Sequence, residues 1–119
     1  MGEVAVKFGY ARVSTDEQSD NAQLDALNAA GCERIYNEKF SGKSKQRPEL
    51  ERLIDSLRTG DTVVVQRLDR LGRSLKDLIE LLDGFKSQQV SFISLNENID
   101  TTTAVGELAF HMIGSIAQF

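Results

Sequence analysis

Apolar and polar residues alternate along this chain in patterns that predict several strands. From Val4 to Ser14 the alternation has a period of two, as in a strand with one face more buried than the other. The run TVVVQ at 62–66 is typical of a buried parallel strand, and VSFISL at 90–95 predicts another. The apolar pair within "RIY" at 34–36 indicates one more, short strand.

Helical spacing of apolar residues follows three of these strands. Leu24 and Leu27 predict a first helix, begun by a capping box of Asp20 and Gln23 and ended by Gly31. A second helix is expected to begin at Pro48 and end at Gly60, and a third to be capped by Ser74. Their apolar faces would carry Leu50, Leu53, Ile54 and Leu57 in the second helix, and Leu75, Leu78, Ile79, Leu82 and Phe85 in the third.

Strands that alternate with amphipathic helices indicate an α/β fold, with a mainly parallel sheet covered by helices on both faces. Period two places Tyr10, Arg12 and Ser14 on one side of the first strand. Ligand sites of such sheets lie at the carboxyl ends of the strands. We therefore expect Ser14 to approach the loop at 69–73, which follows another strand.

The last segment, 103–119, reads as an apolar helix beyond a core formed by 1–102. Threonines suit its N-cap, and His111 falls in a narrow polar line. Its wide apolar stripe consists of Val105, Leu108, Ala109, Met112, Ile113 and Ile116, widened by Phe110, Ala117 and Phe119. Such a helix belongs either to the core or to an interface between subunits, and we favour the interface because the preceding core is already complete.

Composition limits the possible classes of protein. The chain has 119 residues and a net charge of −4, which fits one domain and argues against a grip on nucleic acid by the whole surface. Basic residues concentrate locally in GKSKQR at 42–47 and RLDRLGRSLK at 67–76. We expect a cytoplasmic protein without a membrane span, in which Cys32, the single cysteine, has a structural role.

The candidate chemistry centres on a serine with arginines and no histidine partner. His111 is expected on the surface, no GxSxG motif surrounds Ser14, and residues that bind metals are too few and scattered for a metal site. The fragment SGKS at 41–44 matches only the end of a phosphate loop. Guanidinium groups fit phosphate oxygens and stay charged, so arginines can stabilise phosphoryl transfer without a metal. Arg67 is expected to form only a surface salt bridge.

Three motifs, YARVST at 10–15, SGKSKQRPEL at 41–50 and LDRLGRS at 68–74, resemble the catalytic domain of the serine recombinases, the resolvase and DNA-invertase family. The resemblance covers the chain from Phe8 onward. It implies that Ser14 attacks a DNA phosphodiester, giving a 5′-phosphoserine and a free 3′-hydroxyl, and that strands are exchanged and rejoined without ATP, metal or another cofactor. The implied catalytic residues are Ser14, Arg12, Arg47, Asp69, Arg70 and Arg73, with Tyr10, Gln18, Glu38 and Ser41 in support.

The resemblance also implies partners: double-stranded DNA at a crossover site, and further copies of the chain in a dimer and a synaptic tetramer. Family members continue along a long helix into a basic arm and a helix-turn-helix module. This sequence ends at Phe119, so we expect those parts to be absent and DNA binding to be weak and nonspecific. Ser56 departs from the family, many members of which carry a basic residue near this position.

Two other classes remain possible at this point. A receiver-like signalling domain would share the size and the strand-helix alternation, but it needs paired acids after its first strand, where Arg12 and Ser14 stand. A non-catalytic assembly module would use the final helix and leave the serine idle. A covalent adduct between DNA and Ser14 separates an enzyme from such a scaffold.

Overall fold

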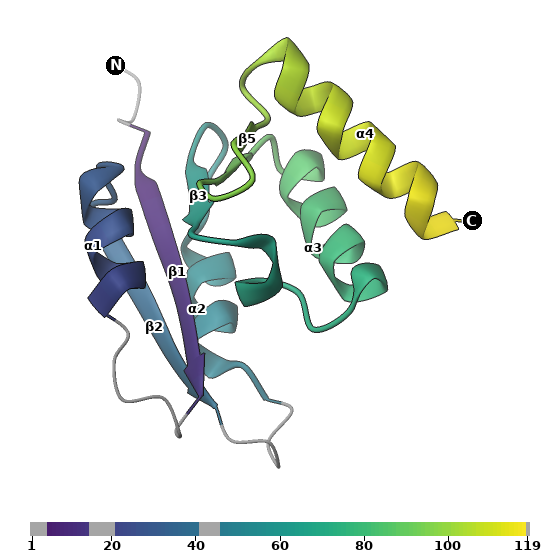
Figure 1. The fold of residues 1–119 in the computed structure, drawn as a ribbon. Coiled ribbons are helices and arrows are strands. Elements are labelled where there is room, and N and C mark those ends of the chain that lie inside the picture. The colour runs from purple at the N-terminus through teal and green to yellow at the C-terminus, as the bar shows by residue number, and fades with distance from the viewer. Residues whose placement is uncertain (1–4, 15–20, 41–45, 119) are drawn as a thin grey trace.

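A computed structural model describes residues 5–14, 21–40 and 46–118, and these form one five-stranded sheet covered by helices (Figure 1). The strand order is β2-β1-β3-β4-β5, in which the first four strands are parallel and β5 is antiparallel to β4. The strands are β1 (Lys7–Ser14), β2 (Arg34–Phe40), β3 (Thr62–Val65), β4 (Ser91–Ser94) and β5 (Ile99–Asp100). The α/β class with a mainly parallel sheet is confirmed.

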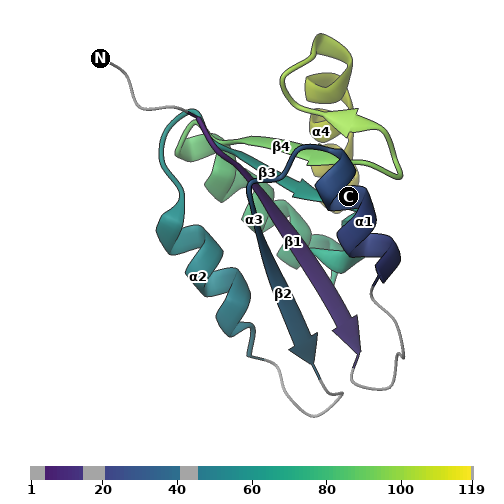
Figure 2. The same cartoon turned by 90° about the vertical axis from the view of Figure 1, so that its left-hand side faces the viewer.

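Helices lie on both faces of the sheet, as Figure 2 shows. Helix α1 (Asn21–Ala29) covers one face, where Leu27 packs with Ala11 and Val64. Helices α2 (Pro48–Ser56) and α3 (Leu75–Ser87) cover the other face, over a larger cluster that includes Tyr10 and Phe92. The alternation in β1 explains this division, because odd and even residues of a strand point to opposite faces.

Helix α4 (Ala104–Gln118) rests on this core through a few close contacts. Phe110 belongs to the larger apolar cluster, and the backbone N–H of Gly106 donates to Oγ1 of Thr103, which confirms a threonine N-cap. The predicted stripe mostly faces outward: Val105, Leu108, Met112 and Ile116 are 57–77% exposed. In the part of the chain described here, no helix combines the length and apolarity needed to cross a membrane.

Several local predictions are wrong in informative ways. Helix α2 ends at Ser56 rather than at Gly60, whose φ of +96° belongs to the turn before β3. Strand β2 has seven residues, and β5 was not predicted because two residues carry no readable period. Leu75 is 44% exposed, whereas Leu78, Leu82 and Phe85 of the same predicted face are buried in the larger apolar cluster.

The side chain of Gln23 makes contacts that the sequence did not predict. It was expected to close a capping box with Asp20, a residue outside the described ranges. In the described part of the chain its amide pairs with the main chain of β1: Oε1 accepts from the N–H of Arg12 at 3.3 Å, and Nε2 donates to the carbonyl of Arg12 at 3.2 Å. Gln23 is buried, so its amide satisfies backbone groups of Arg12 near the end of β1 without exposing its own polar atoms.

Candidate active site

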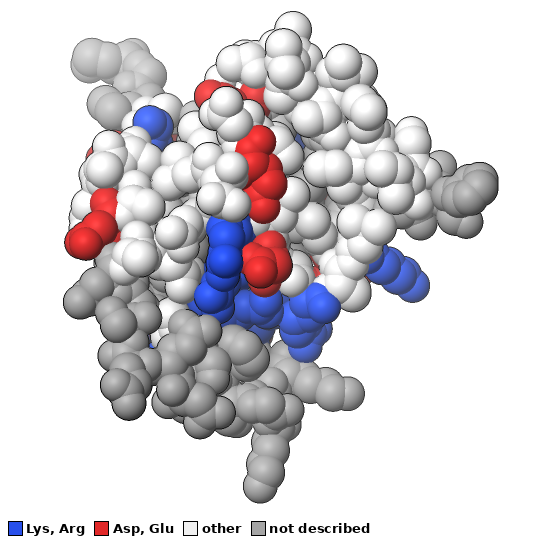
Figure 3. Space-filling model, viewed as in Figure 1, with Lys and Arg blue, Asp and Glu red and all other residues white. Residues whose placement is uncertain are grey.

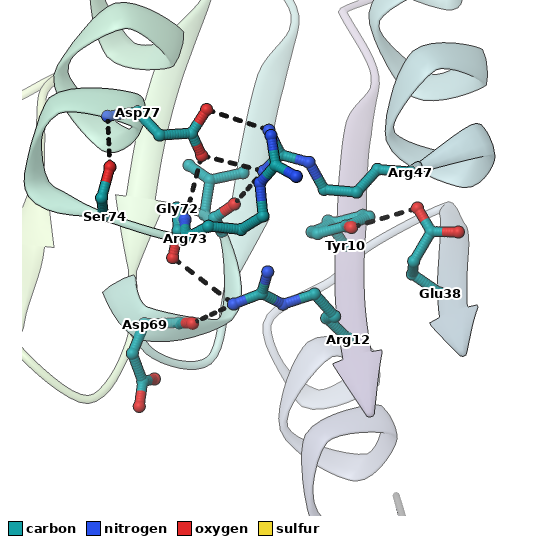
Figure 4. Close-up of polar contacts among 10 residues, drawn as sticks. Tyr10, Arg12, Glu38, Arg47, Asp69, Gly72, Arg73, Ser74 and Asp77 are labelled. Carbon is teal, nitrogen blue, oxygen red and sulfur yellow. Dashed lines mark hydrogen bonds and ion pairs between the residues drawn. The ribbon is translucent and has the colours of Figure 1, made fainter. Parts of the chain in front are cut away.

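Arg12 and Arg70 come from different segments and lie together near the carboxyl end of β1. The side chain of Arg12, only 8% exposed, shares a side of the strand with Tyr10 and donates through Nη2 to the carbonyls of Asp69 (2.6 Å) and Gly72 (3.4 Å). Arg70 donates through Nη1 to the carbonyl of Arg12 at 3.1 Å. The short 3₁₀ helix η1 (Leu68–Arg70) turns the loop so that its carbonyls face the arginine of β1 (Figure 4).

Arg47 reaches the same loop from the start of α2. It occupies the N-cap position before Pro48, and its Nη1 donates to the carbonyl of Leu71 at 3.0 Å. The carboxylate of Asp77, in the first turn of α3, grips the end of the guanidinium: Nη1 to Oδ2 measures 3.0 Å and Nη2 to Oδ1 2.9 Å. The same Oδ2 accepts the backbone N–H of Arg73 at 2.9 Å. Asp77 therefore joins two segments that carry predicted site residues.

Glu38 fixes the beginning of α2 from the neighbouring strand. Its carboxylate is 2% exposed and accepts the hydroxyl of Tyr10 at 3.2 Å and the backbone N–H groups of Glu49 and Leu50 at 3.1 Å each. A carboxylate on the first N–H groups of a helix is stabilised by hydrogen bonding and by the helix dipole. Through these bonds Glu38 also sets the place of Arg47, one residue before the helix.

The electrostatics of this cluster suit an anion. Burial lowers the pKa of Arg12, and the nearby charges of Arg47 and Arg70 lower it further. Burial also raises the pKa of Tyr10, and the adjacent Glu38 adds to that shift, so the phenol stays protonated. In the view of Figure 3, Lys and Arg side chains gather close to this end of β1. A phosphate or carboxylate entering here would meet several guanidiniums at once.

Asp69 contacts the arginines differently from what the resemblance implies. Its main-chain carbonyl binds Arg12, whereas its carboxylate is 70% exposed and forms an ion pair with Nε of Arg67 at 3.4 Å. The salt bridge predicted for Arg67 is thereby confirmed. The carboxylate that holds an arginine fork is Asp77, which was not singled out, because an acid in the first turn of a helix is ordinarily a partner of the helix dipole.

The structure brings together most of the residues expected at this site. Tyr10, Arg12, Glu38, Arg47, Asp69 and Arg70 are connected by the bonds described above. Arg73 follows on the same loop, where its side chain is exposed. The backbone of Ser14 ends β1 in register with Phe40, but its side chain lies outside what the structure describes, as do Gln18 and Ser41. Among the described residues, no group of three or more His, Cys, Asp or Glu side chains could hold a metal ion.

Comparison with known proteins gives consistent matches. The family described as "Resolvase, N terminal domain" matches residues 7–119. The chain is 48% identical over 111 residues to the transposon Tn917 resolvase of Enterococcus faecalis, and 49% identical over 116 residues to the transposon Tn552 DNA-invertase BinR of Staphylococcus aureus. These matches cover 93% and 96% of this chain but 60% of each relative, so the chain spans about three fifths of their length.

A solved structure extends the comparison to three dimensions. The N-terminal catalytic domain of TP901-1 integrase superposes with a TM-score of 0.77 at 37% identity, over 95% of this chain and 94% of that domain. The match includes nearly the whole chain, so the sheet and its helices are shared rather than a single motif.

Proposed function

Because this chain belongs to the resolvase and DNA-invertase family of serine recombinases, we propose that it is the catalytic domain of a site-specific DNA recombinase. The observation that carries the proposal is the meeting of Arg12, Arg47 and Arg70, from three segments, at the end of the strand that carries Ser14. The arrangement is suited to a DNA phosphate approaching that serine.

The proposed reaction is an in-line exchange of esters. The hydroxyl oxygen of Ser14 attacks the phosphorus, the new Oγ–P bond forms as the P–O3′ bond breaks, and the hydroxyl proton leaves Oγ. The departing 3′ oxygen takes up a proton, which leaves a 5′-phosphoserine. One phosphoester replaces another, so reversal with a new 3′-hydroxyl rejoins strands without ATP or another cofactor.

The arginines supply the stabilisation of charge in this proposal. The phosphorane-like transition state carries more charge on its equatorial oxygens than the diester does, and guanidiniums already in place stabilise it without reorganisation. Arg12, Arg47 and Arg70 are assigned to the phosphate, with Arg73 at the rim. Asp69 is assigned to orienting the arginines and assisting the proton of the leaving oxygen, which requires its exposed carboxylate to turn from Arg67.

Four further residues are assigned supporting roles. Tyr10 and Glu38 hold the start of α2, and with it Arg47, through buried hydrogen bonds. Gln18 and Ser41 are assigned to support on the resemblance of their motifs alone. No step in this scheme needs a metal ion, because the guanidiniums carry the charge that a metal would otherwise offset.

The experiment is the capture of the covalent intermediate. The natural full-length protein that carries these residues is incubated with a nicked duplex crossover substrate that traps the cleaved strand, and the products are separated on a denaturing gel. We expect a protein–DNA adduct that is lost in Ser14→Ala and strongly reduced in Arg12→Ala. An adduct that persists in Ser14→Ala rejects the nucleophile, and an active protein without any adduct rejects the mechanism.

Self-association and double-stranded DNA are the proposed partners. The outward apolar face of α4 would be buried in a dimer of 103–119 helices and, with DNA, in a synaptic tetramer. Sedimentation at increasing concentration tests the dimer, and a chain that stays monomeric throughout contradicts it. Action on DNA is consistent with the cytoplasmic location expected from the sequence.

A further inference from the structure

Asp77 is not among the site residues that the family motifs imply, yet its carboxylate binds the guanidinium of Arg47. We propose that Asp77 is a positioning residue, which holds Arg47 by the end of its guanidinium so that one flank alone is offered to a phosphate. This inference rests on the proposed function, because it assigns a task to Arg47 in that reaction. It gives Asp77 no contact with the substrate.

The count of donors on Arg47 supports this role. A guanidinium has five N–H groups. Three are used by the bonds to Leu71 and to both oxygens of Asp77. The two that remain are Nε–H and the second Nη2–H, which lie along one flank and have no partner among the described residues. Two parallel N–H groups are the arrangement that grips two oxygens of a phosphate. A lysine would offer a point charge instead.

Asp77 is not needed to begin its own helix. The N-cap of α3 is Ser74, whose Oγ accepts the backbone N–H of Asp77 at 3.1 Å. The carboxylate of Asp77 is turned away from that cap, toward Arg47 and the N–H of Arg73. The cap and the arginine fork can therefore be removed separately by mutation.

The environment of the pair makes its geometry well defined. The side chain of Arg47 is 12% exposed and that of Asp77 is 21% exposed, so water competes little for either. Asp77 ties the start of α2 to the start of α3, and Glu38 fixes α2 from its other side. A guanidinium held at its end and at its backbone has little freedom to rotate. Small errors in the placement of such a group are costly for a reaction that depends on alignment.

Kinetics of the covalent adduct test the role directly. In the full-length protein, Asp77→Asn removes the charge and one acceptor of the fork, and we expect adduct formation at saturating DNA to slow by about 10- to 100-fold with DNA affinity changed by less than about threefold. Asp77→Glu restores the charge and should recover part of the rate. Ser74→Ala, which removes only the helix cap, and Asp83→Asn, an exposed carboxylate of the same helix, serve as controls and should leave the rate near wild type.

A double-mutant cycle with Arg47→Lys separates positioning from a general structural effect. Lysine cannot be held at a fork, so Asp77→Asn should slow the Arg47→Lys protein by less than about twofold further. An equal loss in both backgrounds, or no loss in the first, overturns the inference. If Ser14→Ala abolishes the adduct while Asp77→Asn does not slow it, the proposed function stands and this inference fails.

An NMR measurement that needs no catalysis tests the positioning of Arg47 even if the proposed function fails. The Nε–Hε resonance of Arg47, assigned by ¹⁵N NMR, should be resolved in the wild type and shift on addition of inorganic phosphate. In Asp77→Asn it should broaden or average toward that of a free arginine, and the shift with phosphate should shrink. If the wild type forms no adduct but the resonance behaves in this way, the proposed function fails while Asp77 still positions Arg47. An unchanged resonance in Asp77→Asn overturns the positioning role.

Discussion

The hydroxyl of Tyr10 lies 3.2 Å from a carboxylate oxygen of Glu38, with both side chains buried beneath the first turn of α2. The bond links two neighbouring strands, and the same carboxylate caps the helix that follows Arg47. Structural support for the site therefore begins in the core of the domain.

Tyr10→Phe removes that bond while keeping the ring. A buried carboxylate losing a donor should lower the free energy of unfolding by about 1–3 kcal/mol, measured by urea denaturation. Tyr36→Phe is the matched control, because the hydroxyl of Tyr36 meets Ser56 at 3.1 Å in a partly exposed place. Equal losses in the free energy of unfolding would show that the buried Tyr10–Glu38 bond contributes no more to stability than the partly exposed Tyr36–Ser56 bond.

Gly106→Ala tests the close approach of α4 to the sheet. A Cβ at this position would overlap the carbonyl oxygen of Asp100, so the start of the helix would have to shift. We expect a loss of stability of about 1–3 kcal/mol and faster hydrogen exchange along α4. Gly114→Ala, with no atom within 4 Å of its Cβ, should instead stabilise the helix by about 0.5–1 kcal/mol. Unchanged exchange in Gly106→Ala would contradict this packing.

The stability contributed by Asp77 should depend on pH. Burial alone would raise the pKa of this carboxyl, but the bonds from Arg47 and the N–H of Arg73 outweigh it and hold the pKa below its ordinary value. A depressed folded pKa adds stability above the unfolded value of about 3.9 and loses it as the pH falls through the folded value. The difference between wild type and Asp77→Asn should thus be constant at pH 5–7 and shrink below about pH 4.

Urea denaturation at a series of pH values measures this difference. Ser74→Ala should lower stability by about 0.5–2 kcal/mol at every pH in the series, because a hydroxyl does not titrate there. If the difference in the free energy of unfolding between wild type and Asp77→Asn stays unchanged down to pH 2, the side chain of Asp77 contributes through packing and not through its charge.

Leu108→Asp should weaken self-association without unfolding the chain. Leu108 is 60% exposed on the outward face of α4, so a charge there costs little in the monomer but would be buried in a dimer. We expect at least a tenfold weaker dimer by sedimentation, which corresponds to about 1.4 kcal/mol. Ser115→Asp, at an exposed polar residue of the same helix, should associate as the wild type does. If Leu108→Asp dimerises as strongly as the wild type, the outward face of α4 is not the dimer interface.

The thiol of Cys32 should react slowly. Burial raises its pKa to about 11, so little thiolate exists at neutral pH. Alkylation by iodoacetamide at pH 7.5 should be at least about tenfold slower than that of free cysteine, and urea should restore the ordinary rate. Rapid alkylation of the folded chain would contradict the structural role predicted for this residue.

The periodicity of the sequence was sufficient for the main elements and for part of the site. Alternation from Val4 to Ser14 placed Tyr10 and Arg12 on one side of β1, and the structure confirms this. Tyr10 packs in the cluster under α2 and α3 and binds Glu38, and Arg12 reaches the carbonyl of Asp69 in the loop that leads to α3. The cap at Ser74 and the helix start at Pro48 were also predicted correctly. These features depend on residues within one turn or one strand of each other, so local chemistry determines them.

The partners of the arginines could not be predicted in this way. Arg47 and Asp77 are 30 residues apart, and they meet because α2 and α3 cover the same face of the sheet, which brings the starts of the two helices together. For the same reason the sequence could not show that Gln23 binds the backbone of Arg12 or that the carboxylate of Asp69 turns to Arg67. The sequence by itself determined the helices, the four parallel strands and the end of the sheet that bears the basic residues. Only the tertiary structure decided which oxygen each guanidinium meets, because that choice depends on how distant segments pack.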